Sequence, residues 1–231
     1  MGESKTTPPF FMFHHLVFDL DGTLLETLPD IRLAINRALK DLGYAHQFSL
    51  AESKKLIDDG ADMLVHRALK EFDTPEAFAA LKEKYMPYYA EMQNDHAKPF
   101  NGLPPVLSFL STRGIKLYVV TNKPDALAQK VVTYHYGNLF EAILGIQEGT
   151  KVKPDPSLVN RLVSRYEIDK GDLLLIGDSH VDIETAENAG IQCCLVTWGY
   201  DFYKPALLER ADYVCKRPKE LARIALGQEG W

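Results

Sequence analysis

Two aspartates stand one residue apart in the segment Phe18-Asp-Leu-Asp-Gly-Thr-Leu24. Alternate side chains of an extended segment point to the same side, so Asp19 and Asp21 present their carboxylates together. Such a pair can divide the work of a nucleophile and of a general acid or base. Acids also commonly end strands, and Asp-Gly is a common turn, so the spacing alone leaves a structural role open.

A second acidic pair, Asp178 and Asp182, lies in the segment Gly177-Asp-Ser-His-Val-Asp182. A spacing of four residues at the start of a helix brings both acids close together. Clustered carboxylates without cysteine or paired histidine ligands favour a hard cation such as Mg²⁺. Asp182 could also serve only as the N-cap of the helix.

Candidate donors to a phosphate group occur in two further segments. Thr121 and Asn122 follow the apolar pair Val119-Val120, and Lys153 lies in Lys153-Pro-Asp-Pro156, where the prolines fix the backbone. Taken alone, a threonine after a strand or a surface lysine is usually structural or solvated. Their order along the chain is more informative than any one of them.

The motifs follow short apolar runs that are typical of buried strands, at residues 16–20, 115–120, 172–177 and 192–197. Helical periodicity occupies residues 125–134, 156–166 and 182–189. This alternation predicts an α/β fold with a doubly wound parallel sheet. Ligands of such sheets bind beyond the carboxyl ends of the strands, where Asp19, Thr121 and Asp178 fall.

Residues 28–97 contain helical periods and no convincing strand. The segment Thr27-Leu-Pro-Asp30 resembles a capping box that opens an amphipathic helix ending at Gly43, and further helical periods cover 50–57, 61–72 and 75–91. Proline and glycine are frequent from Lys98 to Pro105, as expected at a domain boundary. We therefore predict a disordered leader at 1–9, a core formed by 10–26 and 98–231, and an all-helical inserted domain at 27–97.

Composition excludes several classes of protein. The chain of 231 residues is 46% hydrophobic, which excludes disorder for the bulk of it. Its formal net charge of -6, without a long basic run, disfavours nucleic-acid binding and favours a small-molecule partner. The apolar stretch Phe10 to Phe18 is shorter than the roughly 20 residues that span a bilayer. We predict no membrane segment, no secretory signal and a cytoplasmic location.

Together and in this order, the four motifs resemble those of the haloacid-dehalogenase superfamily of aspartyl phosphatases, specifically members with a helical cap after the first strand. The resemblance covers residues 13–226 and implies the Rossmann-like core of that superfamily. Within it, the segments Val119-Val-Thr-Asn-Lys-Pro124 and Thr197-Trp-Gly-Tyr200 look most like phosphoglycolate phosphatases.

The resemblance implies a role for each motif. Asp19 would attack phosphorus and form an aspartyl-phosphate, and Asp21 would protonate the leaving alkoxide and later activate water. Magnesium would be held by Asp19, Asp178 and the backbone carbonyl of Asp21, with Asp182 behind the metal as an orienting residue. The phosphoryl oxygens would be held by Thr121, the Asn122 amide and Lys153.

The inserted domain matches the mobile cap of the family, which closes over the site and contributes to specificity. Arg67 and Lys123 are possible substrate contacts, although each could equally be a solvated side chain. The sequence departs from the family pattern at Glu26-Thr27, where Asp-Ser is usual. It also has Asp58-Asp59-Gly60 where phosphoglycolate phosphatases commonly have Gly-x-Gly, which adds negative charge near the entry of an anionic substrate.

The sequence thus predicts a Mg²⁺-dependent phosphatase of a small phosphorylated metabolite, with 2-phosphoglycolate as the best single substrate. Inorganic pyrophosphate and a broad range of sugar or nucleotide monophosphates are the alternatives. A phosphomutase is disfavoured because Gly177 precedes Asp178 where sugar-phosphate mutases of the family usually have glutamate. A dehalogenase is disfavoured because Asp21 supplies an acid/base group that dehalogenases lack, and a binding module because no catalytic position is missing.

Overall fold

The computed structural model describes residues 13–201 and 205–227. The predicted leader at 1–9 lies outside them. Six strands form a parallel sheet in the order β5-β4-β1-β6-β7-β8. The strands are β1 His15–Phe18, β4 Lys116–Pro124, β5 Ala142–Ile146, β6 Leu173–Gly177, β7 Gln192–Val196 and β8 Tyr213–Cys215.

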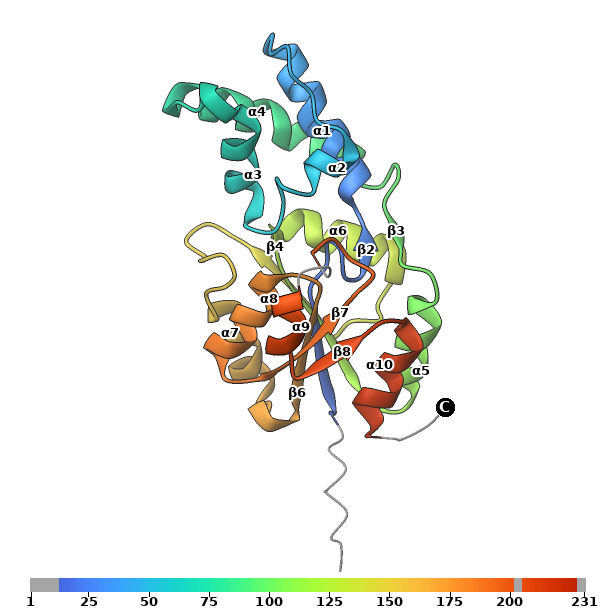
Figure 1. The fold of residues 1–231 in the computed structure, drawn as a ribbon. Helices are drawn as coiled ribbons and strands as arrows, with labels where there is room; N and C mark the ends of the chain where they lie inside the picture. The colour runs from blue at the N-terminus through green and yellow to red at the C-terminus, as the bar shows by residue number, and fades with distance from the viewer. Residues whose placement is uncertain (1–12, 202–204, 228–231) are drawn as a thin grey trace, which may run out of the picture.

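Helices cover both faces of this sheet (Figure 1). They are α5 Leu103–Thr112, α6 Asp125–Tyr136, α7 Ser157–Tyr166, α8 His180–Ala189, α9 Pro205–Arg210 and α10 Pro218–Leu226, with a 3₁₀ turn at Lys170–Asp172. The predicted doubly wound parallel sheet is confirmed. Four strands were expected from their apolar runs, and the structure adds β5 and β8 at the two edges of the sheet.

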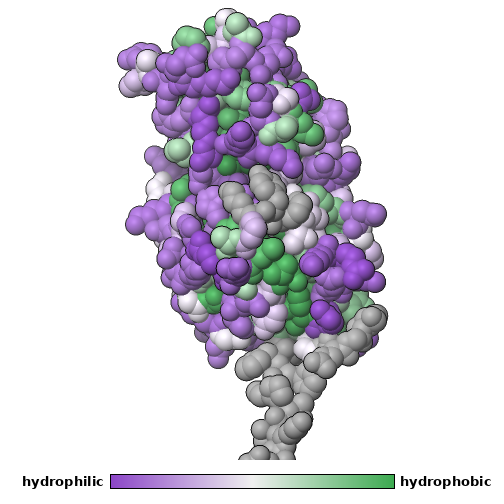
Figure 2. Space-filling view, viewed as in Figure 1, coloured by the Kyte–Doolittle hydropathy of each residue, from purple (hydrophilic) through white to green (hydrophobic). Residues whose placement is uncertain are grey.

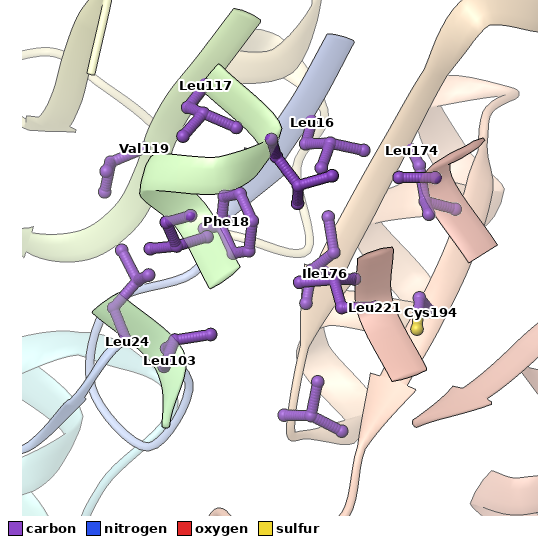
Figure 3. Close-up of a cluster of buried hydrophobic side chains, with 14 of the residues drawn as sticks. Leu16, Phe18, Leu24, Leu103, Leu117, Val119, Leu174, Ile176, Cys194 and Leu221 are labelled. Carbon is purple, nitrogen blue, oxygen red and sulfur yellow. The ribbon is translucent and has the colours of Figure 1, made fainter. Parts of the chain in front are cut away.

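Alternate residues of the central strands supply two separate cores. Phe18, Leu117 and Val119 pack against α5 and α10 in one cluster, part of which is drawn in Figure 3. Their neighbours Val17 and Tyr118 belong to the cluster on the other face, with residues of α7 and α8. This two-sided burial explains why the strands read as continuous apolar runs rather than as alternating ones.

Strand β1 lies at the switch point of the sheet. The chain continues from β1 to β4 and β5 on one side and then to β6, β7 and β8 on the other. At a switch point the connections diverge and leave a crevice at the carboxyl ends of the strands. The segments after β1 and β6, and the end of β4, therefore meet at one place.

The inserted helices lie beyond this end of the sheet (Figure 1). They are α1 Leu28–Asp41, α2 Leu50–Ser53, α3 Gly60–Leu69 and α4 Pro75–Met92, with a 3₁₀ turn at Lys70–Phe72. They share a buried cluster of their own, which includes Ile35, Leu69 and Leu81. The chain enters and leaves through a short antiparallel pair, β2 Leu25–Glu26 with β3 Lys98–Pro99. Figure 2 shows mainly hydrophilic residues over these helices on the face in view.

The predicted capping box at Thr27 is wrong. Thr27 makes no side-chain capping bond, and the buried Asp30 carboxylate instead accepts the backbone N–H groups of His96 at 3.0 Å and Ala97 at 2.8 Å. Backbone N–H donors from the connection that follows α4 have taken the place of the local donors that a capping box would use. Asp30 therefore joins the two connections of the insertion to each other. The second helical period is also shorter than expected, because α2 ends at Ser53.

Among the described residues, no helix is both long enough and apolar enough to cross a lipid bilayer.

Candidate active site

A cavity of about 60 Å³ lies between the carboxyl end of the sheet and the inserted helices. Its walls differ in chemistry. The sheet side is polar and charged, whereas the insertion contributes mostly apolar and aromatic side chains. The sheet-side lining includes Asp19, Asp21, Thr121, Asn122, Lys123 and Lys153, and the insertion side includes Ile31, Ile57, Asp58, Leu64, Tyr85 and Tyr89.

Three carboxylates meet at the sheet side of the cavity. One oxygen from each of Asp19, Asp178 and Asp182 lies within 4.8 Å of the other two. Asp19 follows β1, and its backbone N–H donates to the carbonyl of Ile176 in β6 at 2.9 Å. This bond fixes the first motif against the strand that ends at Asp178. Hard oxygen donors at this separation fit a divalent cation such as Mg²⁺.

The carboxylates can approach so closely because glycines leave room for them. A Cβ atom on Gly199 would lie 2.2 Å from an Asp178 carboxylate oxygen, and one on Gly22 would lie 2.5 Å from the same atom. A Cβ on Gly177 would lie 2.1 Å from Cγ of Asp182. Gly22 also has a φ of +90°, which a residue with a side chain rarely adopts. These glycines shape the acidic cluster without contributing a functional group.

Asp178 is held by two donors from the core. Thr23 Oγ1 donates to Asp178 Oδ1 at 2.9 Å, and the backbone N–H of Tyr200 donates to Oδ2 at 2.7 Å. The carboxylate is 1% exposed. Two fixed donors on a buried carboxylate define its orientation and leave further lone pairs for a metal.

Lys153 is the cation of the acidic cluster. Its Nζ lies 2.7 Å from an oxygen of Asp19 and 2.7 Å from an oxygen of Asp182, and the side chain is 3% exposed. The Asn122 side chain fixes the lysine backbone, accepting from its N–H at 2.7 Å and donating to its carbonyl at 3.1 Å. The same amide donates to the carbonyl of Asp58 in the insertion at 3.0 Å. Asn122 therefore fastens a core loop and the insertion to the end of β4.

Burial and repulsion between carboxylates raise the pKa values of three acids at the site. Burial, with repulsion from Asp182 and Asp21, raises the pKa of Asp19 to about 7 against the opposing effect of Lys153. Burial and repulsion from Asp182, Asp58 and Asp19 raise the pKa of Asp178 well above its usual range. Burial and repulsion from Asp182 and Asp19 raise the pKa of Asp58 to about 8. The site therefore holds more acidic groups than nearby cations can neutralise, and a divalent cation would relieve this imbalance.

Thr121 and Lys123 lie within β4, which extends past the run predicted for this strand. The Thr121 hydroxyl is buried and accepts the backbone N–H of Lys123 at 3.2 Å, so its own hydrogen is available for a ligand oxygen. Lys123 Nζ lies 3.1 Å from Asp21 Oδ1 and also contacts the hydroxyl of Tyr89. The ammonium therefore reaches the candidate acid/base residue.

Arg67 is engaged away from the cavity. Its guanidinium pairs with Asp59 and donates to the carbonyl oxygens of Leu56 at 3.3 Å and Ile57 at 2.9 Å. It does not line the cavity. These contacts hold the loop before α3 in place, and the charge of Arg67 balances that of Asp59.

Several residues at the site were not identified from the sequence. Thr23 lies within the first motif and Tyr200 ends the segment Thr197-Trp-Gly-Tyr200, so their positions in those segments were the available signal. Tyr89 lies on α4, far along the chain from these motifs. The structure stacks Tyr85 on Tyr89, and both line the cavity.

The model of the family described as haloacid dehalogenase-like hydrolase matches residues 16–196 of the chain. The chain belongs to this family. A phosphoglycolate phosphatase from Mannheimia succiniciproducens is 33% identical over 225 residues, covering 92% of this chain and 98% of the relative. One from Cereibacter sphaeroides is 35% identical over 190 residues, covering 80% of this chain and 85% of the relative. The chain is a phosphatase of this family.

The fold also matches solved structures. The crystal structure of a predicted phosphoglycolate phosphatase from Haemophilus somnus superposes with a TM-score of 0.85 at 30% identity, covering 94% of this chain and 99% of the other. The agreement extends over the core and the inserted helices, because so little of either chain lies outside the match. The arrangement of both parts is thus shared with this relative.

Proposed function

We propose that the chain is a Mg²⁺-dependent phosphatase that hydrolyses 2-phosphoglycolate through an aspartyl-phosphate on Asp19. The observation that carries this proposal is the position of Asp19. Its carboxylate lines the cavity at the switch point of the sheet, 2.7 Å from Lys153 and next to Asp178. The names of relatives that match nearly the whole chain support the choice of substrate.

The metal would be held by the carboxylates of Asp19 and Asp178 and by the backbone carbonyl of Asp21. When bound, Mg²⁺ neutralises acidic charge and orients the phosphate towards the nucleophile. Asp182 is better suited to a place behind the metal, because Lys153 donates to one of its oxygens and Ser179 donates to the other.

The chain's own residues would carry two displacements. An oxygen of Asp19 forms a bond to phosphorus while the bond to the leaving oxygen breaks, and Asp21 donates a proton to that oxygen. Water then attacks the aspartyl-phosphate, Asp21 takes a proton from the water, and phosphate leaves Asp19 as a free carboxylate. Lys153, the Thr121 hydroxyl and the Asn122 backbone amide would hold the phosphoryl oxygens throughout.

We further propose that residues 27–97 form the cap and that 10–26 with 98–231 form the catalytic core. The small cavity and its apolar insertion side favour a short leaving group over a hexose or a nucleoside. The acidic loop of the insertion is compatible with an anionic substrate. Asp59 is paired with Arg67, and Asp58, with its pKa raised to about 8, is mainly uncharged at neutral pH.

The test is phosphate release from 2-phosphoglycolate, pyrophosphate and a panel of sugar and nucleotide monophosphates, with and without Mg²⁺. We expect metal-dependent release with a strong preference for 2-phosphoglycolate and none from an Asp19→Asn variant. Preference for pyrophosphate, or equal rates across the panel, would contradict the substrate. Activity retained by Asp19→Asn would contradict the nucleophile.

A further inference from the structure

Lys123 is a buried cation shared between the core and the insertion. Its side chain is only 1% exposed, and its Nζ lies 3.1 Å from Asp21 Oδ1 and 3.5 Å from Oδ2. A buried ammonium is costly unless its donors are satisfied. The ammonium contacts one group from each part of the protein, the Asp21 carboxylate in the core and the Tyr89 hydroxyl in the insertion.

The Tyr89 side chain is itself fixed in place. It lies on α4, is 3% exposed, and stacks on Tyr85 with ring centroids 5.5 Å apart and planes at 9°. The ammonium of Lys123 also lies 4.3 Å from the centroid of the Tyr89 ring. The lysine is held from the other side by β4, whose residue Thr121 lines the sheet side of the cavity. The contact therefore depends on the insertion being seated on the core.

The chemistry of the ammonium distinguishes the two oxygens of Asp21. An ammonium can only donate, so the nearer oxygen, Oδ1, must accept from Lys123. Because Oδ1 accepts the shorter of the two bonds, Oδ2 is the favoured position for the proton that Asp21 transfers. The bond from Lys123 fixes the plane of the carboxyl group and directs the Oδ2 proton away from the lysine.

We propose that Lys123 and Tyr89 are positioning residues for proton transfer by Asp21. Lys123 holds Oδ1 so that the proton on Oδ2 faces the leaving oxygen, and Tyr89 holds Lys123 when the insertion is seated. This rests on the proposed acid/base function of Asp21. It differs from the expectation that Lys123 contacts the substrate, because its ammonium is already engaged by these two partners.

A double-mutant cycle on the full-length protein tests the proposal. The variants are Lys123→Met, Asp21→Asn and the combination, assayed with Mg²⁺ and 2-phosphoglycolate. We expect Lys123→Met to lower kcat about tenfold or more with little change in KM, as part of the roughly hundredfold or greater effect typical of general acid–base catalysis. In the Asp21→Asn background the same change should cost less than about twofold, because residues that act as a unit are not additive.

Two small substrates separate proton donation from substrate binding. Ethyl phosphate has a basic leaving group that needs a proton, whereas acetyl phosphate, of similar size, has a leaving group that does not. Neither carries a carboxylate that Lys123 could bind. We expect Lys123→Met to lower kcat/KM for ethyl phosphate at least about fivefold more than for acetyl phosphate, as Asp21→Asn should also do.

Tyr89→Phe removes only the hydroxyl and keeps the stacked ring. We expect about a fivefold lower kcat, the size expected for one lost hydrogen bond of ordinary strength, with the same preference for acetyl over ethyl phosphate. Tyr88→Phe is the matched control, because Tyr88 is the adjacent residue of α4 and its hydroxyl contacts Asp41 at the surface. It should match the wild-type protein. Thermal unfolding of each variant verifies folding, and Tyr89→Phe decides the question if Lys123→Met does not fold.

Equal losses from Lys123→Met in both backgrounds would overturn the proposal. So would a raised KM confined to 2-phosphoglycolate, which would identify Lys123 as a substrate contact. A Tyr89→Phe protein indistinguishable from wild type would overturn the coupling to the insertion. These results differ from failure of the proposed function, in which the wild-type protein itself would release no phosphate.

Discussion

Replacing Lys153 with methionine should destabilise the protein in a way that depends on pH. The ammonium makes two bonds of 2.7 Å to the buried carboxylates of Asp19 and Asp182, and removing one partner of a buried ionic network costs about 3–5 kcal/mol. We expect a loss of about 4 kcal/mol in the free energy of unfolding at about pH 8, without metal. Lys153 itself remains charged, because these carboxylates raise its pKa.

The sign of the pH dependence follows from Asp19. Its pKa in the folded protein is raised to about 7, so between about pH 4 and pH 7 the folded state binds more protons than the unfolded state, and stability falls as pH rises. Without Lys153 the pKa of Asp19 rises further, which deepens that fall. At about pH 5.5, where Asp19 is already protonated, the loss should therefore shrink to about half of its value at pH 8.

Urea unfolding of the wild-type protein and of Lys153→Met, in EDTA at both pH values, measures how the loss in unfolding free energy depends on pH. Lys151→Met is the matched control, because Lys151 is exposed and its ion pair among the described residues is with Asp155 at the surface, so its effect should stay within about 0.5 kcal/mol. A loss that is the same at both pH values, or below about 1 kcal/mol at pH 8, would refute the reasoning, since it would mean that the carboxylates do not depend on the ammonium.

Three further predictions concern other parts of the molecule. Gly199→Ala should lower Mg²⁺ affinity at least about tenfold by calorimetry, because its Cβ would displace Asp178, whereas Gly171→Ala, whose Cβ would make only an ordinary contact of 3.4 Å with the Asp169 side chain, should not. Asp30→Ala should cost about 3 kcal/mol in urea unfolding, since buried backbone donors lose a carboxylate, and a cost below about 1 kcal/mol would contradict this. Magnesium binding should release more protons at about pH 6 than at about pH 8.5, because Asp19 with its pKa of about 7 must ionise to bind and is already mostly ionised at the higher pH. Calorimetry in buffers of different ionisation enthalpy measures this, and release independent of pH would argue against Asp19 as a ligand.

The sequence predicted the sheet and the meeting of its motifs because both depend on local patterns. Apolar runs that end in Asp19, Thr121 and Asp178 can be recognised one at a time, and parallel pairing brings their ends together without further information. The edge strands β5 and β8 were missed, since they are less buried and their runs are weaker. Local patterning therefore predicted the centre of the sheet better than its edges.

Contacts between distant segments were not predictable from the sequence. The pattern at Thr27 fits a capping box, but Asp30 found partners some 66 residues away. Tyr89 reads as one of several apolar residues of a helix, and only the packing of α4 brings its hydroxyl to Lys123. The charge expected at Asp58 was likewise altered by burial, which raises its pKa. Each of these depends on tertiary structure and not on spacing.

Tyr200 links two parts of the protein that the sequence separates. Its backbone N–H fixes the carboxylate of Asp178, and its hydroxyl accepts the N–H groups of Thr27 at 2.9 Å and Leu28 at 3.1 Å, where the insertion begins. A displacement of the insertion therefore acts on the residue that orients Asp178. By thermodynamic reciprocity, a ligand that tightens the hold on Asp178 would also stabilise this position of the insertion. Ligand binding at the acidic cluster and the position of the inserted helices are therefore energetically coupled through Tyr200.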